Sequence, residues 1–232
     1  MVGREKEWTR DNAYDRSQGA KTPPSYPNEL LVKLCSSRKY SDLTEVLFHG
    51  PIDVLEIGSF SGNNMRMFLE KGWRVSGTEI NTELTNMGSE NLKRMGYLSP
   101  EVRIGDNLTQ PWAPSHFDLL VSINTIHYSS NNDVIRALLE FRRVLRDTGV
   151  AIIETVGPRH FAVTNSTRNG PLDWTWQAGG FREGQSFGFF DSAEHFAEVL
   201  GAVFSKVEVN VRTEAGPKIQ LDFLTAVVSG CA

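Results

Sequence analysis

The chain has few cysteines: Cys35 and Cys231 are the only two among 232 residues. They lie far apart in the sequence, and such a pair is a weak indication of a disulfide, so we interpret both as reduced thiols of a cytoplasmic protein. No set of cysteines and histidines has the spacing of a zinc site, and the carboxylates do not cluster in a way that demands a metal. The sequence therefore predicts no bound metal.

Long hydrophobic runs are absent as well. No stretch approaches the ~20 apolar residues that a membrane-spanning helix needs. Residues 1–21 are polar and lack the apolar core of a secretory signal. We expect a soluble, cytoplasmic protein that has no membrane partner.

Basic charge is scarce. The formal net charge is −4, and no basic run is longer than the pair Arg142 and Arg143. Since a protein that binds a phosphate backbone usually carries a basic face, nucleic acid is not an expected partner. What the chain does contain, 40% hydrophobic and 22% charged residues, is typical of one well-cored globular domain at this length.

Apolar runs and amphipathic segments alternate after residue 51. We predict strands at residues 52–57, 74–79, 101–105, 117–123 and 149–156, and helices at residues 63–71, 82–95 and 132–146. Strands that are separated by helices form a parallel sheet with helices on both faces, so the predicted fold class is doubly wound α/β. Residues 203–213 and 219–228 follow one another across a short turn and predict a C-terminal antiparallel hairpin.

The N-terminal part differs from this core in composition. Residues 1–50 predict an N-terminal helical cap segment, with short helices near residues 28–36 and 42–48. Asn28 and Ser41 are plausible caps of these helices because their side chains can accept hydrogen bonds from the first free amides. The main domain is then expected to comprise residues 51–232.

Residues 157–190 interrupt the alternation of strands and helices. They are rich in glycine, proline and aromatic residues and show little periodicity. A segment of this length in a compact domain is more often functional than a mere connection, so we predict a substrate lid. Asp191 and Glu194 then have the spacing of a capping box, which predicts a helix that runs to Leu200.

The most informative motif lies in residues 54–62, whose sequence is VLEIGSFSG. An apolar run that breaks into glycines is typical of a buried parallel strand that opens into a tight turn and a helix. Gly58 and Gly62 let the backbone approach a ligand closely. Glu79 ends the next predicted strand, where a carboxylate can accept hydrogen bonds from two vicinal ribose hydroxyls. These features predict a site for a nucleoside-bearing cofactor at the carboxyl ends of the first strands.

In these features the chain resembles the class I S-adenosylmethionine-dependent methyltransferases. The matching positions are Glu56-x-Gly58-x-x-x-Gly62, Glu79, Gly105-Asp106 and the fourth strand, which ends at Asn124. The terminal hairpin also matches, because the family adds an antiparallel seventh strand to its parallel sheet. The resemblance implies a seven-stranded, Rossmann-like sheet that is parallel except for one strand of the C-terminal hairpin. One position departs from the family pattern, since Phe60 stands where the glycine-rich turn has its middle glycine.

The resemblance implies S-adenosylmethionine as the cofactor, with its methionine part near the first turn. The turn from Gly58 through Ser59 to Gly62 would pass the methionine part. Glu56 precedes this turn and belongs to the same predicted site. Asn124 would meet the ammonium group and the reacting sulfonium.

The same resemblance places the adenosine part at the next two strands. Glu79 would hold the ribose hydroxyls, and Ile80 would offer an apolar face to the adenine. Asp106 and Asn107 would contact the exocyclic amine and a ring nitrogen.

Methyl transfer depends mostly on alignment in a dry pocket, and an oxygen or nitrogen acceptor also has to lose a proton. His127 is the leading candidate for a base because it follows the fourth strand, in the loop where the acceptor should lie. An equally weighted interpretation is that His127 caps the next helix or packs beside Tyr128. His160, just after the fifth strand, is the second candidate.

Aromatic residues outside the core complete the predicted site. Trp174 and Trp176 lie in the predicted lid, where they can stack on a flat or sugar-like substrate or attach the lid to the body. Tyr14 in the N-terminal segment can close over the cofactor.

Missing motifs narrow the chemistry. The segment Asn124 to His127 is not the Asn/Asp-Pro-Pro-Tyr/Phe of enzymes that methylate the amino group of adenine in nucleic acid, which disfavours that activity. No cysteine lies near the fourth strand, which excludes cysteine-dependent methylation at a pyrimidine carbon. No tyrosine has a lysine four residues later, which disfavours a nicotinamide-dependent short-chain dehydrogenase. We therefore predict methyl transfer to oxygen or nitrogen of a small molecule, a metabolite or sugar-like compound. A protein, peptide or RNA acceptor and a non-enzymatic cofactor-binding module are the alternatives, and the sequence does not specify the oligomeric state.

Overall fold

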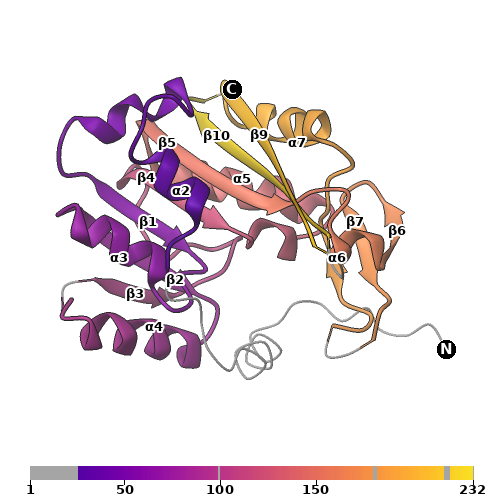
Figure 1. The fold of residues 1–232 in the computed structure, drawn as a ribbon, viewed down its shortest axis with the longest axis horizontal. Helices are drawn as coiled ribbons and strands as arrows, with labels where there is room; N and C mark the ends of the chain where they lie inside the picture. Colours follow the sequence, from indigo (N-terminus) through magenta and orange to yellow (C-terminus); the bar gives the residue numbers. More distant parts are fainter. Residues whose placement is uncertain (1–25, 99, 180–181, 217–219, 232) are drawn as a thin grey trace.

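A seven-stranded sheet forms the centre of the computed structural model, which describes residues 26–98, 100–179, 182–216 and 220–231. The strand order is β3-β2-β1-β4-β5-β10-β9. All neighbouring pairs are parallel except those of β10, which runs antiparallel to both β5 and β9. The predicted doubly wound α/β fold is therefore confirmed (Figure 1). The strands are β1 (Asp53–Ile57), β2 (Arg74–Glu79), β3 (Glu101–Ile104), β4 (Phe117–Ile123), β5 (Leu145–Val156), β9 (Lys206–Ala215) and β10 (Gln220–Ser229).

Helices cover both faces of the sheet, and the pattern of burial explains why. Val54 and Leu55 of β1 point to opposite faces, yet both are fully buried, as expected for a parallel sheet covered on both sides. Leu55 packs with residues of α5 and α7, whereas Val54 packs with residues of α2, η1 and α3. The helices are α2 (Glu29–Leu34), η1 (Asp42–Phe48), α3 (Asn63–Glu70), α4 (Thr82–Arg94), η2 (Ile126–Tyr128), α5 (Asn132–Val144), α6 (Phe161–Thr164) and α7 (Ala193–Gly201).

Side-chain caps define the start of several helices. Asn28 accepts a hydrogen bond from the amide of Leu31 at 3.0 Å, and Ser41 accepts one from Leu43, as the sequence predicts. The segment after Ser41 is a 3₁₀ helix.

The predicted capping box at the start of α7 is one residue out of register. Ser192, not Asp191, is the N-cap, and it accepts a hydrogen bond from the amide of His195. Asp191 instead forms an ion pair at 2.8 Å with Arg168.

Residues 157–190 contain regular structure, contrary to the lack of periodicity in the sequence. They form α6 and a small antiparallel sheet of β6 (Ser166–Gly170), β7 (Asp173–Trp176) and β8 (Ser186–Phe187). This small sheet lies beyond the carboxyl ends of the strands of the main sheet (Figure 1). It is attached by an apolar cluster that includes Val156 at the end of β5, Trp176 and Phe187.

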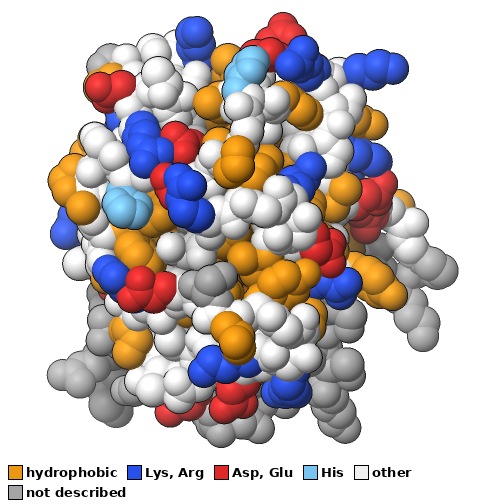
Figure 2. Space-filling model, turned by 90° about the vertical axis from the view of Figure 1, so that its left-hand side faces the viewer, with side chains coloured by type: hydrophobic (Ala, Val, Ile, Leu, Met, Phe, Trp, Pro, Cys, Tyr) orange, Lys and Arg blue, Asp and Glu red, His pale blue; other side chains and the backbone are white. Residues whose placement is uncertain are grey.

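Charged side chains of both signs alternate on the face that Figure 2 shows. Lys and Arg side chains lie among Asp and Glu side chains there, without one large patch of a single sign (Figure 2). At the amino ends of the strands, Asp53 of β1 forms ion pairs with Arg74 at 2.5 Å and with Arg146 at 2.9 Å. In the part of the chain that the structure describes, no helix combines the length and hydrophobicity needed to cross a bilayer.

Candidate active site

A cavity of about 530 Å³ opens at the carboxyl ends of β1, β2 and β4. This is the edge at which doubly wound sheets bind their ligands. Many residues that the sequence singled out line the cavity: Glu56, Gly58, Ser59, Glu79, Ile80, Asp106, Asn107 and Asn124. They come from the ends of β1 and β2 and from the loops after β1, β2, β3 and β4, so the fold brings them together from positions far apart in the chain.

The turn after β1 is shaped by close packing on both sides. Gly58 has φ +70°, and a Cβ at this position would lie 2.2 Å from Cγ2 of Thr125 in the loop after β4. Gly62, with φ +76°, does not line the cavity. A Cβ there would lie 2.8 Å from Cγ of Leu92, so this glycine lets α3 begin close to α4. Gly58 therefore shapes the cavity itself, whereas Gly62 serves helix packing.

Glu79, at the end of β2, supports the turn from the neighbouring strand. Its Oε1 accepts a hydrogen bond from the amide of Phe60 at 2.6 Å, and its Oε2 accepts one from the amide of Ile80 at 3.1 Å. Its side chain is largely buried and lines the cavity. The carboxylate is thus held by the turn after β1 and by the residue that follows β2, and both of these segments line the cavity.

Three buried polar atoms of cavity-lining residues have no hydrogen-bond partner among the described residues: Glu56 Oε2, Ser59 Oγ and Asn124 Oδ1. Buried polar groups in proteins are nearly always paired, so a group of unpaired ones around a cavity points to a polar ligand. A ligand ammonium group supplies donors that these oxygens lack. The residues present therefore fit the methionine part of S-adenosylmethionine.

Glu56 is the most perturbed of the three residues. Burial, with a smaller contribution from the charge of the nearby Glu79, raises the pKa of its carboxyl to about 8, although a hydrogen bond from Asn64 opposes the shift. Its Oε1 accepts that bond from Nδ2 of Asn64 at 2.7 Å. A buried carboxyl that faces a cavity beside a second carboxylate favours a cationic ligand.

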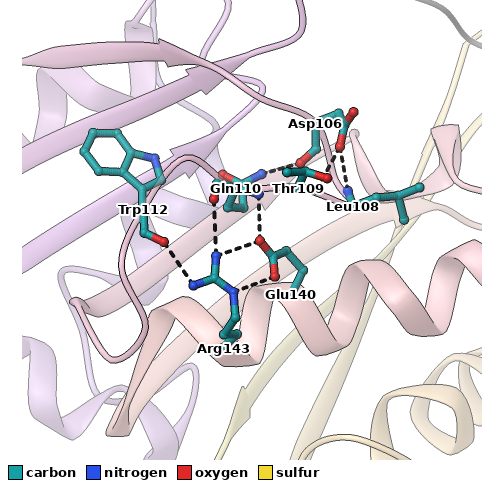
Figure 3. A network of polar contacts seen from close by, with 7 residues as sticks. All are labelled: Asp106, Leu108, Thr109, Gln110, Trp112, Glu140 and Arg143. Atoms are coloured by element: carbon teal, nitrogen blue, oxygen red, sulfur yellow. Dashed lines mark hydrogen bonds and ion pairs between the residues drawn. The ribbon is translucent and has the colours of Figure 1, made fainter.

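The loop after β3 presents Asp106 to the cavity. Asp106 Oδ1 accepts hydrogen bonds from the amides of Leu108 at 2.9 Å and Thr109 at 2.8 Å, which closes a tight turn. Gln110 donates from Nε2 to the carbonyl of Asp106 at 2.6 Å (Figure 3). The turn that holds Asp106 is therefore defined by its own polar contacts.

Helix α5 holds this loop from the other side. Glu140 Oε1 accepts a hydrogen bond from the amide of Gln110 at 2.7 Å. Arg143 donates to the carbonyls of Gln110 at 3.2 Å and Trp112 at 3.0 Å, and also pairs with Glu140 (Figure 3). One ion pair on α5 thus fixes the backbone on which Asp106 depends.

Asn107 connects the loop after β3 to the loop after β4. Its Nδ2 donates to the carbonyl of Thr125 at 2.9 Å and to Oγ of Ser129 at 3.0 Å. The side-chain amide is therefore engaged by the protein, and the backbone of Asn107 is the part available to a ligand.

Neither candidate histidine lines the cavity. His127 lies in η2, with Nδ1 3.3 Å from Oγ1 of Thr155 and its ring 4.6 Å from that of Tyr128. His160 is the N-cap of α6 and accepts a hydrogen bond from the amide of Ala162. Burial lowers the pKa of His160 to about 4. A role as a base is thus untested for both, and the residue of η2 that does line the cavity is Tyr128.

Trp174 and Trp176, the two tryptophans of the predicted lid, also lie outside the cavity lining. Trp176 is buried in the apolar cluster, and its Nε1 donates to the carbonyl of Gly179 at 2.9 Å. Trp174 packs near Phe189, with ring centroids 6.1 Å apart. Among the described residues of 157–190, Ser186 lines the cavity. Tyr14 falls outside the described residues.

Sequence reasoning missed several lining residues: Tyr26, Asn28, Tyr128, Ser129, Asp133 and Ser186. Tyr128 and Ser129 follow the fourth strand directly, so their place in the chain was a usable signal. Asn28 was recognised only as a helix cap. Ser186 belongs to a two-residue strand, which is too short for any periodicity to show.

No group of three or more cysteine, histidine, aspartate or glutamate side chains within the described part of the chain is arranged to hold a metal ion.

Comparisons with known proteins agree with this geometry. Residues 55–153 match a family model described as a methyltransferase domain. No curated protein matches the sequence.

Several solved structures have a similar fold. The 1,6-didemethyltoxoflavin-N1-methyltransferase of Burkholderia thailandensis, with bound 1,6-didemethyltoxoflavin and S-adenosylhomocysteine, aligns with a TM-score of 0.64 at 15% identity, covering 96% of this chain and 87% of that chain. A SAM-dependent methyltransferase from Methanosarcina mazei has a TM-score of 0.61 at 16% identity, covering 80% and 95%. The PH0226 protein from Pyrococcus horikoshii OT3 has a TM-score of 0.61 at 17% identity, covering 92% and 98%. At these identities the likeness shows the fold.

Proposed function

We propose that this chain, a class I S-adenosylmethionine-dependent methyltransferase, transfers the methyl group to an oxygen or nitrogen atom of a small molecule, a metabolite or sugar-like compound. The observation that carries the proposal is a single cavity that extends from Glu79 and Asp106 to Tyr128 and Ser186. Its volume, about 530 Å³, lies within the range of small-molecule sites.

The cofactor would occupy the part of the cavity formed by β1, β2 and the loop after β3. Glu79 would accept hydrogen bonds from the ribose hydroxyls, and Asp106 with the backbone of Asn107 would contact the adenine. Glu56 and Asn124 would accept hydrogen bonds from the ammonium group. When bound, the cofactor supplies a methyl group on a sulfonium, which is already a good leaving group.

The acceptor would lie beside Tyr128, Ser129 and Ser186. These residues offer hydroxyl groups that both donate and accept hydrogen bonds, which suits a polar acceptor. Arg182, in the loop between β7 and β8, donates to the hydroxyl of Tyr128 at 3.1 Å. This contact places the phenol at the junction of cavity and lid, where it can orient an acceptor for in-line transfer.

The lid and the N-terminal segment are part of the same proposal. We assign residues 157–190 as the substrate lid because Ser186 lines the cavity and Gly188 donates to the carbonyl of His127 at 2.9 Å. We assign residues 1–50 as a cap segment because Tyr26 and Asn28 also line the cavity.

A small acceptor is favoured over a macromolecule. The similar Burkholderia enzyme has the small molecule 1,6-didemethyltoxoflavin bound, and the charges of this chain alternate in sign on the face shown in Figure 2. Phosphate backbones are usually bound by basic surfaces, which disfavours RNA.

The test is transfer of radiolabelled methyl from S-adenosylmethionine to fractionated pools of metabolites, peptides and RNA. We expect label in a low-mass product. Tyr128→Phe removes only the hydroxyl, and it should lower the transfer rate by about tenfold or more without changing cofactor affinity, because it acts on alignment of the acceptor.

His127→Gln serves as the comparison, because His127 lies next to Tyr128 but outside the cavity lining. We expect a smaller loss of rate than in Tyr128→Phe. Label found only in peptide or RNA would contradict the small-molecule proposal. A larger loss of rate in His127→Gln than in Tyr128→Phe would support His127 as the base.

A further inference from the structure

Phe60 occupies a backbone conformation that glycine adopts far more easily. It stands in the middle of the turn between β1 and α3 with φ +44°. Residues that carry a Cβ are strained in this left-handed region, and glycine is not. If only the shape of the turn mattered, glycine would be the better residue here. Strain of this kind at a cavity suggests that the side chain has a function.

Two contacts hold the strained turn. The amide of Phe60 donates to Oε1 of Glu79 at 2.6 Å. The carbonyl of Phe60 faces Gly88 in α4, where a Cβ would lie only 2.7 Å from the carbonyl oxygen. A glycine within a helix lowers helix stability. Gly88 therefore destabilises α4 locally, but it leaves space for the carbonyl of Phe60.

The ring of Phe60 is not explained by packing of the protein core. Phe60 is partly exposed, lines the cavity and stands next to Glu79. It belongs to none of the three buried apolar clusters and has no ring contact with another aromatic residue of the described chain. A large apolar side chain that the core does not use, in a cavity for a nucleoside, is placed to contact the ligand.

We propose that Phe60 is a further cofactor-binding residue, whose ring packs against the ribose and thioether part of the S-adenosyl group beside Glu79. Gly88 acts as a positioning residue, because it keeps the carbonyl of Phe60 in place without reaching the cavity. The proposal rests on the proposed cofactor site and is independent of the acceptor.

The experiment is calorimetric titration of wild type, Phe60→Gly and Phe60→Leu with S-adenosylhomocysteine and with 5′-methylthioadenosine, which lacks the amino-acid part. Phe60→Gly should weaken both ligands by about tenfold or more, because the contact lies on the part that they share. Phe60→Leu keeps an apolar side chain and should stay within about threefold of wild type. The melting temperature of Phe60→Gly should change little, since relief of strain offsets the added freedom of the unfolded chain.

Gly88→Ala provides a second, independent variant. Its methyl group would displace the carbonyl of Phe60, so both ligands should bind more weakly although residue 88 lies outside the cavity. Gly201→Ala in α7 is the matched control, because nothing lies within 4 Å of a Cβ there, and it should bind as wild type does. Wild-type affinity of Phe60→Gly for both ligands would overturn the inference. Failure of the wild-type protein to bind either ligand would overturn the cofactor site itself, and the inference with it.

Discussion

Glu56 makes the free energy of unfolding of the cofactor-free protein depend on pH. Its folded pKa of about 8 lies above the ordinary value of 4.5 for a glutamate, so between these values the folded state keeps a proton that the unfolded state has lost. Stability should therefore fall as pH rises through this window, by at most about 1.4 kcal/mol per pH unit. Chemical denaturation of wild type and Glu56→Gln at several pH values measures the difference, because the glutamine keeps the shape and does not titrate.

The useful window for this experiment is pH 6.5 to 8. His160 has a folded pKa of about 4 against an ordinary value of 6.5 for a histidine, so its contribution to stability rises with pH up to 6.5 and opposes that of Glu56. Above pH 6.5, of these two residues only Glu56 still makes stability depend on pH.

Cofactor binding should also depend on pH between 6.5 and 8. A ligand ammonium favours the ionised form of Glu56, so cofactor binding should release a proton and strengthen as pH rises across this window. Equal binding enthalpies in phosphate and Tris buffers would show that no proton is released.

At the scale of single residues, strand ends were predictable and side-chain directions were not. Glu79 and Asn124 were located because each follows an apolar run that forms a buried strand, and both line the cavity. His127 and Tyr128 are neighbours in a single 3₁₀ turn, yet only Tyr128 lines the cavity. Which of two adjacent rings faces a cavity depends on the path of the turn, and no sequence period encodes it.

At the scale of elements, the loop after β3 depends on α5. Arg143→Ala would remove two hydrogen bonds to the carbonyls of Gln110 and Trp112 and leave Glu140 without its ion-pair partner. We expect a loss of stability of about 1–2 kcal/mol together with weaker binding of S-adenosylhomocysteine, because the turn at Asp106 loses its support. Urea denaturation and calorimetric titration measure the two effects.

Arg66→Ala is the control for Arg143→Ala. Arg66 also forms an ion pair on a helix, with Glu70 at 2.7 Å, but this pair is solvent-exposed. Such pairs contribute about 0–1 kcal/mol, so this variant should retain both stability and affinity. If the two arginine variants behaved alike, the loop after β3 would not depend on α5.

Strands of the main sheet were predicted well, whereas the short strands within residues 157–190 were missed. Strands β2 and β4 have the predicted limits, 74–79 and 117–123. Strands β6, β7 and β8 are five, four and two residues long, so alternation within them is not detectable. The cap of α7 was misplaced because Asp191 is engaged by Arg168, a contact between distant residues that a local pattern does not contain.

At the scale of the whole molecule, the fold class and the C-terminal hairpin followed from the sequence. The contacts that join the N-terminal segment to the sheet did not. Alternating strands and helices with a terminal hairpin predicted a doubly wound sheet with an antiparallel strand, which the structure has. The contacts of Asn28 connect three regions that are far apart in sequence. Its backbone amide donates to Asn64 Oδ1 at 2.8 Å, and its Nδ2 donates to Glu154 Oε1 at 2.9 Å. Asn64 in turn donates to Glu56, so the start of α2 is linked to the ends of both β1 and β5.

Asn28→Ala should therefore destabilise the whole fold, and not only helix α2. It removes the N-cap of α2 and the amide donor to Glu154, a carboxyl that is fully buried and whose pKa is raised by that burial. The loss of the cap costs about 1 kcal/mol, and the unpaired buried acceptor adds about 1–3 kcal/mol. Urea denaturation at pH 7 measures the sum. Asn169→Ala is the control, because Asn169 is exposed and donates one hydrogen bond to Thr175 within the lid.

Asn28→Asp separates the two contributions of Asn28. The aspartate still caps α2, since a carboxylate oxygen accepts the amide hydrogen of Leu31, but it places a second carboxylate beside Glu154 where the amide donated a hydrogen bond. Repulsion between the two carboxylates raises the pKa of Glu154 further, so the folded state holds its proton more strongly than the unfolded state does. The destabilisation by Asn28→Asp should then be larger at pH 8 than at pH 5, whereas that by a lost cap alone would be the same at both. Equal stability of this variant and wild type at pH 8 would show that the contact with Glu154 does not join the N-terminal segment to the sheet.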